Sequence, residues 1–105
     1  MTSETRAAFA AAIAADAAIN FAHRARDYHE VMPDEWTLID EAYWLCRSAQ
    51  ETCQNAADRL DPEKALDDAC MLMAFQSAMG TLERVQEVAD DLVTLATESE
   101  HEIRR

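Results

Sequence analysis

Apolar residues in the last third of the chain recur at alternating spacings of four and three residues. The series runs through Met71, Phe75, Ala78, Leu82, Val85, Ala89, Leu92, Ala96, Ser99 and Ile103, with Ser99 as its polar member. Such a heptad pattern is typical of α-helices that pack lengthwise against neighbours. Further apolar residues flank the series and widen the stripe, so we expect this helix to contact two others.

Two prolines divide the rest of the chain. Met32-Pro33-Asp34 ends a first helix that runs from about Ser3, its expected N-cap, because the residue before proline disfavours helical backbone. A second helix then runs to about Leu60. Asp61-Pro62-Glu63 predicts the start of the third helix, since aspartate caps, proline suits the first helical position and Glu63 adds favourable negative charge.

These segments predict an all-α fold with a single domain over residues 1–105. We expect three long helices in an antiparallel up-down-up bundle, since the short connection at Asp61 requires a hairpin. The one glycine, Gly80, lies in the middle of the third helix. It would permit a kink there, and a complete break into two helices is the alternative.

The predicted lengths leave one end of the third helix without a partner. At about 40 residues it outruns the second helix of about 27, and pairing back from Asp61 places Trp36 near Val88. The apolar residues beyond that level have no cover within the chain; they are Leu92, Val93, Leu95, Ala96 and Ile103. The end could fray or fold back after a kink. We favour a homodimer that buries these residues through the C-terminal helix.

The formal net charge of −12 narrows the possible partners. It argues against direct nucleic-acid binding and against an anionic membrane surface, so a charge-steered partner would be a protein with a basic surface. The charge is uneven, with four acids against three bases in residues 1–31 and seventeen against six in residues 32–105.

Cysteine usage and hydropathy bear on the cellular location. The three cysteines, Cys46, Cys53 and Cys70, are odd in number and widely spaced, which favours reduced thiols in a cytoplasmic protein. No apolar run is long enough to predict a transmembrane helix.

Candidate metal chemistry is weakly supported. Glu98-x-x-His101 has the spacing of half a carboxylate-bridged di-metal site, but the chain has no second copy of the motif. Asp58-x-x-Asp61 and Glu87-x-x-Asp90 resemble the acidic pairs that hold Mg²⁺ in all-helical nucleotide pyrophosphatases. However, Asp61 is already explained as a cap, and no Lys/Arg cluster stands ready for a triphosphate. A metal-dependent nucleotide hydrolase is therefore a remote alternative, and we expect no metal and no cofactor.

Nucleophilic catalysis has equally little support. The apolar stripe of the second helix places Cys46 and Cys53 in the core, where thiols are usually inert. A single glycine also leaves no phosphate-cradling loop. We therefore do not expect an enzyme.

Carboxylates inside the third helix lack the stabilising role that acids have at helix N-termini. They are Asp67, Asp68, Glu83, Glu87, Asp90 and Asp91. Solubility is the simplest explanation, but a row of carboxylates on a rigid helix could also imitate duplex phosphates and occupy a basic groove. Trp44 falls off the main stripe of the second helix and is the candidate for an exposed aromatic anchor.

In size and composition the chain resembles small acidic helical proteins of phages and mobile elements, which include nucleic-acid-mimicking inhibitors of host defence. The leading interpretation is a non-enzymatic acidic binding protein, acting as an inhibitor that occupies a basic surface of a protein partner. The alternative is a structural or assembly module that acts by oligomerising.

Overall fold

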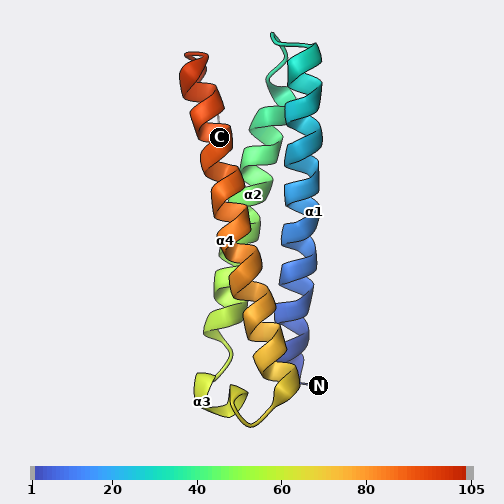
Figure 1. Ribbon diagram of the computed structural model, residues 1–105, viewed down its shortest axis with the longest axis vertical. Helices are drawn as coiled ribbons and strands as arrows, with labels where there is room; N and C mark the ends of the chain where they lie inside the picture. The colour runs from blue at the N-terminus through green and yellow to red at the C-terminus, as the bar shows by residue number, and fades with distance from the viewer. Residues whose placement is uncertain (1, 104–105) are drawn as a thin grey trace.

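The computed structural model describes residues 2–103, and in this range the chain forms three long α-helices, one short helix and no strand. The long helices are α1 (Ser3–Val31), α2 (Thr37–Asp58) and α4 (Ala69–Glu98), and the short helix α3 spans Pro62–Ala65. The long helices pack against one another in a bundle of 51 × 18 × 18 Å (Figure 1). The predicted all-α fold of three packed long helices is therefore confirmed.

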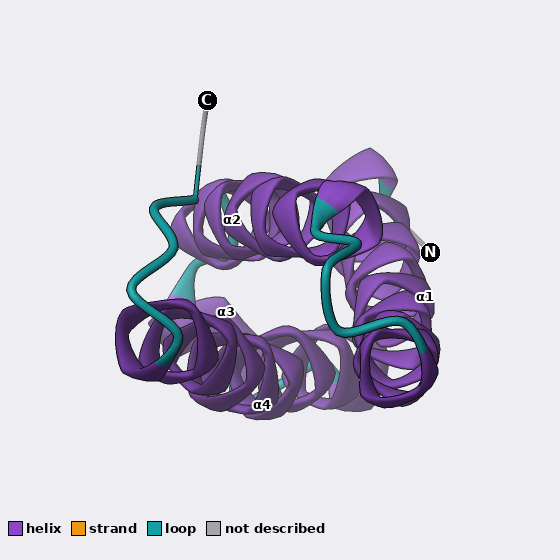
Figure 2. Ribbon diagram, turned by 90° about the horizontal axis from the view of Figure 1, so that it is seen from above, coloured by secondary structure: helices purple, strands orange, loops and turns teal. Residues whose placement is uncertain are grey.

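Each long helix lies beside the other two, as the view along the bundle shows (Figure 2). The Sγ atom of Cys46 lies 3.9 Å from the carbonyl oxygen of Ala18, and that of Cys53 lies 3.4 Å from the carbonyl oxygen of Ala11. These contacts run in opposite senses along the two helices, so α2 returns along α1. The first residues of α1 and α4 lie at the same end of the bundle (Figure 1).

The N-cap of α1 is Thr2, whereas the sequence pattern suggested Ser3. The Oγ1 atom of Thr2 accepts a hydrogen bond of 3.1 Å from the backbone N–H of Thr5. The two hydroxyls also lie 2.8 Å apart, which gives the buried side chain of Thr5 a polar partner. Capping by a threonine in the extended conformation satisfies one of the free N–H groups at the start of the helix.

The prediction of one third helix starting at Pro62 is wrong. Asp61 is a cap, as expected, because its carboxylate accepts a 2.9 Å hydrogen bond from the backbone N–H of Glu63. The helix that it starts, α3, ends after one turn at Ala65. Residues 66–68 then form a turn, and the chain reverses into α4 at the lower end of the bundle (Figure 1).

Asp68 caps α4, which corrects its placement inside a helix. Its Oδ1 atom accepts hydrogen bonds of 3.0 and 3.2 Å from the backbone N–H groups of Cys70 and Met71. Asp67 lies in the preceding turn. Aspartate competes with helix continuation by bonding to nearby backbone N–H groups, and this local competition ends α3 and begins α4.

α4 continues through Gly80 and ends at Glu98, five residues earlier than the heptad series implied. The backbone N–H groups of Glu100 and His101 donate to the carbonyls of Thr97 and Ala96, at 3.1 and 2.8 Å. Glu100 has a φ of 56°, in the left-handed region that favours glycine. These two hydrogen bonds and the left-handed residue form a Schellman motif, which turns the chain back toward the bundle.

The predicted register of α2 against α4 is also wrong. Trp36 stacks on His101, with ring centroids 4.2 Å apart, and does not lie opposite Val88. The chain from residue 59 to residue 68 runs past the end of α2 before α4 begins, which shifts α4 along the bundle. α2 therefore lies beside the C-terminal half of α4 and covers residues that the sequence-based register left bare.

Four of the five residues expected to lack cover contact the core of their own chain. Leu92 and Ala96 are buried, and Leu95 and Ile103 are half-buried against the core. Val93 is 41% exposed. The expectation that Leu92 and Ala96 need a second chain for cover is therefore wrong. In residues 2–103, no helix combines the length and apolarity needed to cross a lipid bilayer.

Candidate functional site

The outward side of α4 carries a row of carboxylates. Glu83, Glu87 and Asp90 follow one another at spacings of four and three residues, and all three side chains are exposed. Within residues 2–103, none of the three lies in an ion pair or a side-chain hydrogen bond. We call these three residues the α4 acidic face. They span about 10 Å of helix at 1.5 Å per residue.

Asp91 lies on the side of α4 toward α1. Its Oδ2 atom is 3.8 Å from Nη1 of Arg26 on α1. Arg84 also lies on α4, and its Nη2 atom donates a 2.6 Å hydrogen bond to Oδ1 of Asp16 on α1. Both pairs are exposed to solvent, where an ion pair contributes about 0–1 kcal/mol. Asp91 lies one turn after Glu87, at the edge of the α4 acidic face, and Arg26 partly neutralises its charge.

Asp67 and Asp68 lie at the far end of α4 from the acidic face. The rise between Asp68 and Glu83 is about 22 Å. The Asp68 carboxylate is also occupied by the cap of α4. The acidic residues predicted as one partner-binding set thus divide into a central row, a pair at the helix start and Asp91 on the side toward α1.

Trp44 lies on α2 and lines grooves that reach Gln86 and Val93 of α4. Its side chain is half-buried, and its ring packs edge-on against Tyr43 with centroids 4.8 Å apart. It lines a groove of about 640 Å³ between α2 and the C-terminal end of α4, together with Val93 and Ile103. A second groove of about 660 Å³, which reaches Gln86, shares the same two aromatic residues. Trp44 can therefore contribute apolar contact to a partner seated between α2 and α4.

A cluster of three aromatic rings closes the end of the bundle where α1 meets α2, and sequence reasoning missed it. The Trp36 ring lies between His29 and His101, with centroid separations of 4.2 Å on both sides. Nε2 of His101 lies 3.7 Å from Oδ1 of Asp40, and both atoms are buried without a hydrogen-bond partner. The Schellman turn after α4 brings His101 here, and no local sequence pattern signals that placement.

The geometry around His101 bears on the metal motif considered from the sequence. His101 faces Trp36 and Asp40. In the part of the chain that the structure describes, no three His, Cys, Asp or Glu side chains gather closely enough to hold a metal ion.

The two buried cysteines have thiols of low reactivity. Burial raises the pKa of the Cys46 thiol to about 11. Burial also raises the pKa of the Cys53 thiol, and the negative charge of Asp16 raises it by a smaller amount. Because the thiolate is the reactive form, both side chains are weak nucleophiles at neutral pH. Cys70 is exposed at the start of α4.

No family model, curated protein or solved structure matches this chain. Function must therefore be inferred from its own surfaces. Around the bundle, the charge distribution gives the clearest contrast, since α4 carries five acids against one base while α1 carries four acids against three bases. Binding through complementary charge is the chemistry that this arrangement offers most directly.

Proposed function

We propose that the protein is a non-enzymatic binding protein that presents the α4 acidic face to a basic surface on a protein partner. The supporting observation is the row formed by Glu83, Glu87 and Asp90, whose carboxylates are exposed and free of intramolecular ion pairs among the described residues. A continuous helix of 30 residues carries the row. Its opposite side is buried at Val85, Ala89 and other core positions, which holds the carboxylates in fixed relative places.

Such a row suits the cations of a nucleic-acid-binding groove. Glu83 and Glu87 are about 6 Å apart along the helix axis, and Glu87 and Asp90 about 4.5 Å. Phosphates on one DNA strand follow at about 3.4 Å along the duplex axis, so each carboxylate spacing covers between one and two phosphate steps. Occupying this kind of groove would exclude nucleic acid from it, which is how the protein would act as an inhibitor.

The row also carries a cost that binding would relieve. Like charges at these spacings destabilise a helix by roughly 0.2–0.5 kcal/mol per pair. Contact with Lys or Arg side chains replaces this repulsion with attraction, accelerates association and makes affinity fall as salt rises.

The test compares two variants of equal net charge. In one, Glu83→Gln, Glu87→Gln and Asp90→Asn remove the α4 acidic face. In the matched control, Asp27→Asn, Glu30→Gln and Glu41→Gln remove three exposed carboxylates from α1 and α2. Each protein is immobilised and exposed to extract of the source cell at about 50 and about 300 mM salt, and the higher concentration more than halves the screening length.

We expect a protein that wild type and the control variant retain at low salt, and that the acidic-face variant loses. Titration of that purified partner should show affinity reduced about 100-fold, since three charge contacts at about 1 kcal/mol each give that factor. Equal loss in both variants would mean that overall charge, and not this face, governs binding.

Assembly by oligomerisation is the second candidate function. The observation in its favour is the exposure of large apolar side chains, including Ile13 and Val93. Self-association through the C-terminal end of α4 would have to use Val93 in the groove beside Trp44. Val93→Asp should then reduce the particle to monomer mass in sedimentation equilibrium.

A further inference from the structure

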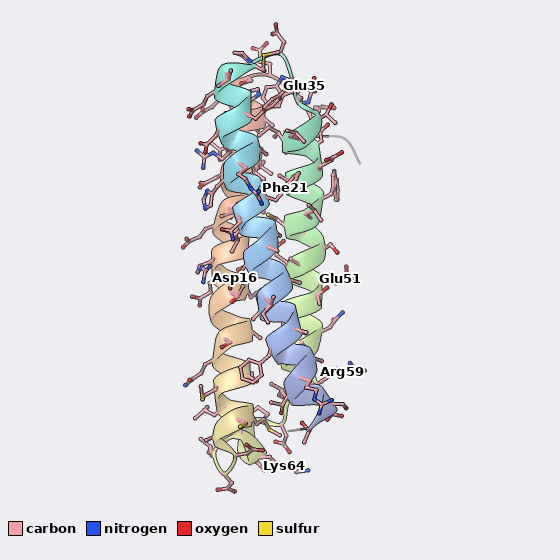
Figure 3. All side chains as sticks on the ribbon, turned by 90° about the vertical axis from the view of Figure 1, so that its right-hand side faces the viewer. Asp16, Phe21, Glu35, Glu51, Arg59 and Lys64 are labelled. Atoms are coloured by element: carbon pink, nitrogen blue, oxygen red, sulfur yellow. The ribbon has the colours of Figure 1, made fainter. Side chains whose placement is uncertain are left out.

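The outward side of α1 is nearly free of carboxylates. Between Arg6 and Arg24 its outward residues are uncharged; they are Ala10, Ile13, Ala14, Ala17, Asn20 and Phe21. We call these six residues and the two arginines the α1 outer face. Asp16, the one acid within residues 7–23, lies to the side of α4 and is bonded to Arg84 there (Figure 3).

This face is apolar where it is most exposed. Ile13 is 70% exposed, and Phe21 lies toward α2 (Figure 3), where a shallow groove of about 330 Å³ also contacts Leu45. Exposed apolar patches on a protein surface mark interaction sites. The alanines between these side chains add little bulk, and small side chains at a contact allow two helices to approach closely.

We infer that the α1 outer face docks on the same face of a second copy of this chain. Two copies of net charge −12 repel each other through most of their surfaces. The α1 outer face presents two arginines and no carboxylate, so it is a side on which the copies can meet without placing carboxylates together. A two-fold interface must also be complementary to itself.

An antiparallel pairing of the two α1 helices meets that requirement when Ala17 lies on the two-fold axis. Ile13 and Phe21 are each four residues from Ala17, so they face each other across the interface. Arg6 and Tyr28 are each eleven residues from Ala17, which brings the guanidinium over an exposed aromatic ring. Cation–π contact and apolar burial then occur together, with the smallest side chain at the point of closest approach.

The area of the α1 outer face indicates how strongly two copies would associate. From Arg6 to Tyr28, the segment that the pairing uses, the helix rises about 33 Å, and a helix is about 10 Å wide, so each copy offers about 330 Å². A standard stable interface buries about 800 Å² per partner. An interface of less than half that size predicts weak association, and the α4 acidic faces of both copies remain exposed.

Sedimentation equilibrium from about 10 to about 500 µM tests this dimer, since these concentrations bracket a dissociation constant of about 100 µM. Wild type should pass from monomer to dimer mass. Ala17→Glu places two carboxylates at the axis and should weaken dimerisation at least tenfold, with helix content unchanged by circular dichroism. The control Gln86→Glu adds the same charge on α4 and should dimerise as wild type does. A monomer at all concentrations, or a dimer broken by Val93→Asp and not by Ala17→Glu, would overturn the proposal.

Disulfide trapping tests the pairing itself in a Cys70→Ser background, because Cys70 is the exposed thiol of the chain. Ala17→Cys should give disulfide-linked dimers under mild oxidation, since the two new thiols meet at the axis. Ala10→Cys is the matched control, because the antiparallel register separates its two copies by about 21 Å. Equal trapping at both positions, or trapping at Ala10→Cys alone, would rule out this register.

Discussion

α1 has 29 residues and α4 has 30, and each packs against the other two long helices. The two helices nevertheless differ in the side chains that they contribute to the core. The core residues of α1 are mostly alanines: Ala8, Ala11, Ala12, Ala15, Ala18, Ala22 and Ala25. Those of α4 include larger side chains: Met71, Leu82, Val85, Val88 and Leu92. α1 therefore permits close approach, while α4 supplies most of the apolar volume.

The two helices differ outside the core as well. α1 carries charges of both signs that nearly balance, and α4 presents a row of carboxylates. Burying one CH₂ group contributes about 0.8 kcal/mol, so the larger side chains of α4 provide more stabilisation per residue than alanines can. This surplus allows α4 to carry repelling charges on its outward side without unfolding.

Removing volume from α4 should have the largest effect. Leu92 is fully buried, and Leu92→Ala would leave a cavity as well as lose apolar contact. We expect the free energy of unfolding to fall by about 2–5 kcal/mol in urea denaturation followed by circular dichroism. The matched control is Leu66→Ala, since Leu66 is 79% exposed in the turn after α3. Similar losses in both variants would contradict the assignment of Leu92 to the core.

Adding volume to α1 should have the next largest effect. Ala22 is fully buried, and Ala22→Leu must push α2 or α4 outward. Overpacking of this kind costs about 1–3 kcal/mol. Ala10→Leu places the same side chain on the exposed side of α1 and should not lower stability in the same denaturation experiment. If Ala22→Leu is tolerated equally well, close approach at α1 is not what the alanines provide.

The start of α4 should show a smaller loss. Asp68→Ala removes an acceptor for two backbone N–H groups and should cost about 1 kcal/mol. Asp67→Ala removes the same charge one residue earlier, in the turn, and should change stability by less than about 0.5 kcal/mol. Thermal unfolding of the two variants side by side separates capping from charge, and equal losses would assign the effect to charge.

The smallest effect should be a gain. Gly80→Ala introduces into α4 an alanine, the residue that is most frequent in the core of α1. A Cβ atom at position 80 would meet nothing within 4 Å. Alanine is favoured over glycine inside a helix by about 1 kcal/mol, so the melting temperature should rise by several degrees. A fall would show that the bundle needs the conformational freedom of glycine at this position.

The sequence was sufficient for the helical fold because its apolar periodicity is long and regular. It failed at residues 66–68 because Leu66-Asp67-Asp68 has no proline or glycine, and an aspartate there can either continue a helix or cap one. The error in register followed from that failure, since residues 62–68, expected to be the first turns of the third helix, form α3 and a turn and displace α4 along α2.

The candidate surfaces were predictable to different degrees. Glu83, Glu87 and Asp90 share one side of a helix by spacing alone, so their exposure on the outward side of α4 follows from the sequence. The half-buried position of Trp44 depends on packing against Tyr43 and α4. The ring contacts of Trp36 with His29 and His101 join three separate segments and depend on the tertiary register, which local patterns do not encode.

The two buried thiols can be used to measure transient opening of the bundle. Cys46 and Cys53 lie against carbonyls of α1 at Ala18 and Ala11, so a labelling reagent reaches them after α1 and α2 separate. The labelling rate of each thiol therefore measures the free energy of opening at its own level of the bundle. Equal rates would mean that the helices part in one cooperative event, and a faster rate at one thiol would identify the end from which the bundle unzips.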